Sequence, residues 1–301
     1  VGKYPLAIRK IRIDLEPTLP RSAFLPNTKL LYSYFLVFFV ILALTISILS
    51  INKTAIQIVL SVLLGFTWTL ALFYVHLFIH GHIVKNKTVQ NILSLPCAYF
   101  GMISPTWWGY WHRLHHRFGT YDENVSGFQT INWVHTPWLN KIINRMKPSQ
   151  NKVSSFVYLF FWKAIAFSIN QIFFLGHPRF PKQINRRNVF LELAILVFAH
   201  GLIIFNLNWK LIILLEIIPW AIQNFLSSIF VVTNHHPKLI NSGYTFQNTC
   251  SVEMKFAWMN SVFMNIGYHT EHHIFPECSP KYLPKLSKIL QEKYDHKPIK
   301  L

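Results

Sequence analysis

Histidines are the residues of this sequence whose spacing points most directly to chemistry. Eight of the 15 histidines form three groups, namely His76 and His80; His112, His115 and His116; and His269, His272 and His273. Separations of three and four residues place side chains on one face of a helix. Gathered neutral imidazoles repel one another once protonated, so a bound cation is expected to organise them. The pattern therefore predicts a metal site.

A further pair, His235 and His236, follows the last long apolar run of the chain. A single HxxxH pair is more often packed or hydrogen-bonded than metal-binding, but four groups at one membrane boundary favour metal binding. About nine imidazoles supply enough nitrogen donors for two metal ions. Imidazole ligands alone do not distinguish zinc, copper, iron and nickel.

The elements that must position these groups are predicted from four uncharged runs. A helix needs about 20 apolar residues to cross a bilayer, and the runs predict transmembrane helices at about 30–51, 55–79, 189–205 and 211–233. Short polar breaks join them in pairs. We therefore predict an all-α integral membrane protein, residues 1–301 forming one domain with two transmembrane hairpins.

The basic residues predict the orientation. All of the 29 Lys and Arg except Lys53 and Lys210 lie outside the two hairpin turns, which places residues 1–29, 80–188 and 234–301 in the cytoplasm. These parts would form a helical cap that holds the histidine groups, with both termini cytoplasmic. We read Val89–Tyr110 as a membrane-surface element and Val153–Leu175 as an interfacial one.

Composition excludes an ordinary soluble domain, because 52% of the residues are hydrophobic and only 13% are charged. The net charge of +18 alone would fit nucleic acid or an anionic membrane face. The apolar runs favour the membrane, and no nucleic-acid partner is expected.

The order HxxxH, HxxHH and HxxHH over two hairpins resembles the membrane-bound fatty acyl desaturase and hydroxylase superfamily. The run GYHTEHHIFPECSPKYLPKL, residues 267–286, is similar to its acyl-lipid and sphingolipid desaturase branch. The resemblance implies two iron ions bound by the eight grouped histidines and by a ninth after the last transmembrane helix. His235 is the expected ninth ligand, with His236 as the alternative.

One departure from the family concerns an asparagine ligand that acyl-CoA members place one turn before the ninth histidine. Val231 and Val232 stand there, so this ligand is either absent or replaced, with Asn234 and Asn265 as the candidate replacements.

The activity implied by this resemblance is oxygen-dependent desaturation of a fatty acyl chain carried by an acyl-lipid, acyl-CoA or sphingolipid. Hydroxylation on the same di-iron scaffold is the alternative within the enzymes, and a histidine-lined metal transporter is the alternative outside them. The sequence has no GxGxxG loop, CxxCH motif or cysteine cluster, so an external ferredoxin or cytochrome b5 type donor is expected. The host membrane would be a bacterial inner membrane or the endoplasmic reticulum.

Other ionisable residues receive weaker predictions. Asp122, Glu123 and Glu271 are candidates to accept the distal N–H of ligand imidazoles, with exposed surface nearly as probable for Glu271. A buried histidine such as His200 is either functional or bonded to a neighbouring helix. The sequence also predicts loop or surface positions for His135, His177 and His296, and helix-end positions near the interface for Glu192 and Glu216.

Overall fold

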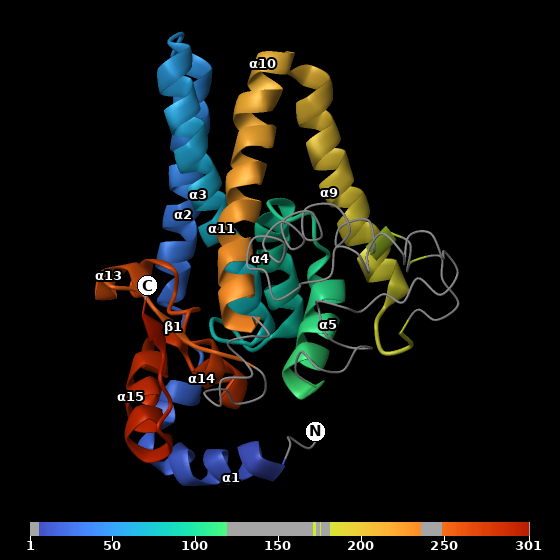
Figure 1. Ribbon diagram of the computed structural model, residues 1–301. Coiled ribbons are helices and arrows are strands. Elements are labelled where there is room, and N and C mark those ends of the chain that lie inside the picture. The colour runs from blue at the N-terminus through green and yellow to red at the C-terminus, as the bar shows by residue number, and fades with distance from the viewer. Residues whose placement is uncertain (1–5, 119–170, 173–174, 176–180, 236–248, 301) are drawn as a thin grey trace, which may run out of the picture. The chain divides into compact units, whose positions relative to one another are not determined.

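The computed structural model describes residues 6–118, 171–172, 175, 181–235 and 249–300 (Figure 1). Most regular elements of this part are α-helices: α1 Leu6–Leu15, α2 Leu30–Ser50, α3 Thr54–Ile79, α4 Lys87–Tyr99, α5 Pro105–Phe118, α9 Arg186–Asn206, α10 Trp209–Ile212, α11 Ile218–His235, α13 Ala257–Val262, α14 His269–Ile274 and α15 Leu283–Tyr294. The others are the short 3-10 turns η1 Glu16–Thr18, η2 Arg21–Phe24 and η5 Pro280–Tyr282, the π-helical segment η4 Ile213–Ile217, and the strands β1 Val252–Glu253 and β2 Ile299–Lys300.

Four helices among the described residues are long and apolar enough to cross a membrane, as predicted. They are α2, α3, α9 and the continuous helix Trp209–Phe230, which includes α10, η4 and part of α11. Large apolar side chains such as Phe35, Phe39 and Phe198 are exposed on them, as expected for surfaces whose solvent is lipid. The predicted all-α membrane fold is confirmed.

The chain forms two compact units, which are described separately. The membrane-helix unit comprises Asn27–Gly109 and Trp162–Ser227. The histidine unit comprises Val1–Pro26, Tyr110–Phe161 and Ser228–Leu301. Helices α5 and α11 each begin in the first unit and end in the second.

Two helical hairpins make up most of the membrane-helix unit. Helices α2 and α3 lie side by side, and α9 is joined at its end to α10 (Figure 1). Gly65 allows α3 to approach α11 closely, because a Cβ there would lie 2.6 Å from Ile222 Cβ and 2.8 Å from the Pro219 carbonyl oxygen. Small residues commonly permit such close contacts between membrane helices.

Helix α4 packs back along α3 and is not among the candidate membrane helices, while the membrane-surface position of Val89–Tyr110 stays a prediction. Its start lies near the C-terminal end of α3, where a Cβ at Gly81 would be 3.3 Å from Gln90 Nε2. Its end lies beside Trp68, whose ring centroid is 4.9 Å from that of Phe100. Trp68 is about three helical turns inside α3. Apolar packing on a candidate membrane helix explains the hydrophobic stretch at this position.

The core of the histidine unit joins the two ends of the chain. Buried Ile11 and Leu15 of α1 pack with Ile274 of α14 and with Leu286 and Leu290 of α15. Strands β1 and β2 pair in parallel, with Val252 opposite Ile299. The third histidine group therefore lies between the first and the last helix of the chain.

Candidate metal centre

Helix α5 carries the second histidine group, and a carboxylate anchors its first turn. Glu192 of α9 accepts hydrogen bonds from the backbone N–H of Thr106 at 3.0 Å and from the Thr106 hydroxyl at 2.6 Å. It also accepts one from Ser104, whose hydroxyl oxygen in turn accepts a hydrogen bond from the Trp107 backbone N–H. A negative charge at a helix N-terminus stabilises the helix. Glu192, which lies near the start of α9, thus anchors the first turn of α5.

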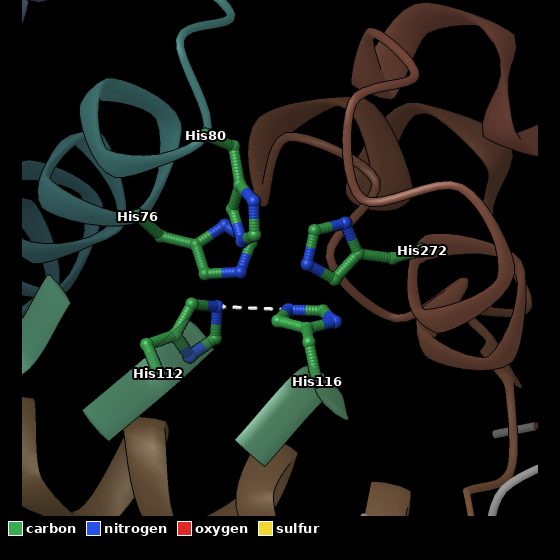
Figure 2. Close-up of side chains that lie close together, drawn as sticks. All are labelled: His76, His80, His112, His116 and His272. Carbon is green, nitrogen blue, oxygen red and sulfur yellow. Dashed lines mark hydrogen bonds between the residues drawn. The ribbon is translucent and has the colours of Figure 1, made fainter. Parts of the chain in front are cut away.

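The imidazoles of α5 fall on two adjacent faces of the helix. His112 and His116 are buried, and their Nε2 atoms lie 3.0 Å apart (Figure 2). Burial lowers the pKa of His115 to about 4. A neutral ring offers the unprotonated nitrogen that a metal ion requires.

Helix α14 carries the third histidine group, whose side chains are also buried. His269 and His273 are both buried, with their Nε2 atoms 3.1 Å apart. The backbone before them is fixed by Gly267, whose carbonyl oxygen accepts hydrogen bonds from the N–H groups of Val252 and His269, each at 2.8 Å. The short helix therefore starts at a defined place.

Within the histidine unit, α5 and α14 bring their imidazoles together as two triplets. The first triplet is His112, His116 and His272, and the second is His115, His269 and His273. In each triplet one ring nitrogen per residue lies within 4.8 Å of the others. Metal–imidazole bonds are about 2.0–2.1 Å long, so each triplet needs only small side-chain shifts to bind one ion. This donor set fits two first-row transition metal ions.

The first histidine group lies at the end of α3 in the membrane-helix unit. His76 is buried in the last turn and His80 follows the helix, with ring centroids 4.7 Å apart. Figure 2 shows both side chains. Their role as ligands, like that of the two triplets, remains a prediction.

His82 is a buried histidine without a predicted role. Its side chain is 2% exposed, its Nε2 has no hydrogen-bond partner among the described residues, and its ring lies 5.6 Å from that of His80. Burial lowers its pKa to about 4. The HxxxHxH spacing is the sequence signal that distinguishes it.

The predicted ninth ligand lies outside the described structure. The side chain of His235 and all of His236 fall outside the described residues, as do Asp122, Glu123, His135 and His177. The two asparagine candidates differ. Asn265 donates a hydrogen bond to the Pro280 carbonyl at 3.1 Å, whereas the Oδ1 atom of Asn234 is buried without a hydrogen-bond partner in the described part of the chain.

The exposed-surface alternative for Glu271 and the surface position predicted for His296 are wrong. Glu271, between the ligand positions of α14, is fully buried and accepts a hydrogen bond from Ser251. His296, expected at the surface, is also buried, and its Nε2 lies 3.1 Å from Glu271 Oε1. Nothing in the sequence around His296 indicates this pairing.

A second buried polar network lies among the membrane helices. His200 Nδ1 is 3.0 Å from Glu216, and His200 stacks on Tyr99 with ring centroids 3.8 Å apart. The Tyr99 hydroxyl donates to Glu216 at 2.5 Å. Glu216, predicted to reach the interface from a helix end, is thus buried within the π-helical segment η4 and paired inside the protein. For His200, bonding to a neighbouring helix is confirmed.

The comparison with known proteins agrees with this histidine arrangement. The family model described as fatty acid desaturase matches residues 53–300, which include all three histidine groups. The chain belongs to the fatty acid desaturase family.

Two of the similar proteins are sphingolipid desaturases. The chain is 28% identical over 143 residues to sphingolipid delta(4)-desaturase DES1 of Drosophila melanogaster, covering 46% of this chain and 41% of that protein. It is 32% identical over 121 residues to sphingolipid delta(4)-desaturase/C4-monooxygenase DES2 of Homo sapiens, covering 39% and 34%. The aligned part of this chain thus spans less than half the length of either relative.

Proposed function

We propose that this protein is an oxygen-dependent lipid desaturase that introduces a double bond into an acyl chain. The substrate would be an acyl-lipid, an acyl-CoA or a sphingolipid, with the named relatives favouring a sphingolipid. The observation that carries the proposal is the pair of imidazole triplets that α5 and α14 form within the histidine unit. Family membership supports the same reaction class.

The proposed metal centre contains two iron ions. Its ligands are His76, His80, His112, His115, His116, His235, His269, His272 and His273, with His236 as the alternative to His235. When bound, the irons supply the activation of dioxygen needed to remove hydrogen from an unactivated methylene, which no side chain can achieve.

Residues of the chain itself would hold and orient the metal centre. The imidazoles of α5 and α14, of which all but His115 are buried, would hold the ions largely away from bulk water. Glu192 fixes the start of α5, and Gly267 fixes the approach to α14. Such outer supports determine how ligands are oriented. A lipid chain would enter laterally between the apolar membrane helices.

Hydroxylation is the second candidate, and one observation favours it. The human relative carries both activities in its name, desaturase and C4-monooxygenase. Both reactions begin by removing one hydrogen. The position of the acyl chain then decides between loss of a second hydrogen and transfer of oxygen.

The electrons would come from a separate ferredoxin or cytochrome b5 type protein. We place both termini in the cytoplasm, with cytoplasmic parts at 1–29, 80–188 and 234–301 of one domain. The membrane would be a bacterial inner membrane or the endoplasmic reticulum. The 27 basic residues outside the hairpin turns support this orientation.

Lipid profiling of a host that expresses the protein tests the proposed activity. The wild-type chain should produce a new unsaturated or hydroxylated lipid, and His272→Ala should abolish it. Glu292→Ala, at an exposed position of α15, is the matched control and should retain it. Unchanged host lipids, together with zinc uptake into vesicles that consume no oxygen, would overturn the proposal in favour of a transporter.

A further inference from the structure

The buried side of α14 is held by polar contacts that the proposed metal ligands do not explain. Thr270, Glu271 and Ile274 have no exposed surface. The Thr270 N–H donates to the Ser251 hydroxyl oxygen at 3.1 Å, and the Ser251 hydroxyl donates to Glu271. Ser251 therefore binds two successive residues of the helix that carries the third histidine group.

The segment after α15 contacts the same two residues, Glu271 and Ser251. Helix α15 ends at Tyr294, because the next residue, Asp295, has a left-handed φ of 50° that terminates the helix. The next residue, His296, is 2% exposed and places Nε2 at 3.1 Å from Glu271 Oε1. Three residues later, the Ile299 N–H donates to the Ser251 carbonyl at 2.8 Å.

Glu271 thus accepts a hydrogen bond from Ser251, the residue before β1, through one carboxylate oxygen, and its other oxygen lies 3.1 Å from His296 Nε2 of the C-terminal segment. A carboxylate without solvent requires such partners, because an unpaired buried charge is strongly destabilising. A helix of six residues has little stability of its own. Its orientation, and that of its three imidazoles, must come from contacts like these.

We propose that His296 is a positioning residue for the metal centre, acting through Glu271 on α14. Retention of metal by the third histidine group then depends on the last residues of the chain, none of which is a proposed ligand. This inference rests on the proposed function only in taking the triplets as metal ligands. It assigns a role to a residue whose place in the sequence suggests none.

A matched pair of substitutions tests the inference. The amide nitrogen of glutamine can reach the position of His296 Nε2, whereas that of asparagine is too short. We therefore expect His296→Gln to keep the contact to Glu271 and His296→Asn to lose it. Lys297→Ala, at an exposed neighbouring residue, is the control for changes to the C-terminal segment.

The measurement is the rate at which a chelator removes cobalt(II) from the purified full-length protein, followed by the visible absorption of the bound ion. Loss of a partner outside the ligand shell costs about 10- to 100-fold in metal affinity. We expect the chelator to remove a fraction of the bound cobalt from His296→Asn at least about tenfold faster than it removes cobalt from the wild type. His296→Gln should stay within about threefold of the wild type, and Lys297→Ala should match it.

Helical circular dichroism of each variant separates this effect from unfolding. A folded His296→Asn protein that retains cobalt like the wild type would overturn the inference while leaving the proposed function intact. If the wild type itself binds no cobalt, the triplets are not ligands and both proposals fail. If His296→Asn does not fold, Ser251→Ala removes the other partner of Glu271 and must show the same faster loss.

Discussion

Replacing Gly267 by alanine should disturb both the stability of the protein and the third histidine group. A Cβ at this position would lie 2.4 Å from the Val252 carbonyl oxygen, whereas ordinary contacts begin near 3.4 Å. The two segments must therefore separate by roughly 1 Å, although the Gly267 carbonyl also accepts the Val252 N–H at 2.8 Å. Overpacking costs about 1–3 kcal/mol, and a weakened buried hydrogen bond adds about 1 kcal/mol.

We therefore expect Gly267→Ala to lower the free energy of unfolding by about 3 kcal/mol and to reduce bound metal. The assay is unfolding in mixed micelles titrated with SDS, followed by tryptophan fluorescence, with metal analysis of the same samples. Gly201→Ala in α9 is the control. Its new methyl group would lie no closer than 3.9 Å to any atom that packs against it, so the substitution should raise the free energy of unfolding by about 0.5–1 kcal/mol. Equal stability and metal content in Gly267→Ala and wild type would refute the reasoning.

Three further predictions concern the hydrogen bonds of Tyr99 and Glu192 and the burial of two histidines. Tyr99→Phe removes a donor to a buried carboxylate and should destabilise the protein by about 1–3 kcal/mol, whereas Tyr32→Phe, which is 79% exposed, should not; equal effects in SDS unfolding would contradict this. Glu192→Ala removes the carboxylate that anchors α5 and should lower the free energy of unfolding by about 1–2 kcal/mol. Glu192→Gln should lower it by less, and equal losses of stability in the two variants would contradict the role of Glu192 as an anchor. Burial lowers the pKa of His82 and His115 from 6.5 to about 4. Below pH 6.5 the unfolded chain then binds protons that the folded chain does not, so metal-free protein should lose stability as pH falls from 6.5 toward 4; a flat pH profile would contradict this.

The histidine groups and the membrane helices could be predicted because both depend on local spacing. Three- and four-residue separations place His112 and His116 on one face of any helix. Long uncharged runs determine membrane helices through their length alone. The observed helix Arg186–Asn206 starts before the predicted residue 189, because Asn185 caps it by accepting hydrogen bonds from two backbone N–H groups.

The buried polar pairs could not be predicted, because their partners are distant in the sequence. Glu271 and His296 are 25 residues apart, and nothing in the spacing of either indicates the other. Glu216 lies near a helix end in the sequence, yet it is buried because α4 packs along α3 and brings Tyr99 to it. Tertiary packing, and not local pattern, determines such contacts.

The count of iron ions per chain tests the central claim most directly. Purified protein should contain about two irons, measured by elemental analysis. Because His272 and His273 belong to different triplets, His272→Ala and His273→Ala should each retain about one iron while remaining folded. Wild-type protein without iron, or iron content unchanged by both substitutions, would contradict a two-ion centre built on α5 and α14.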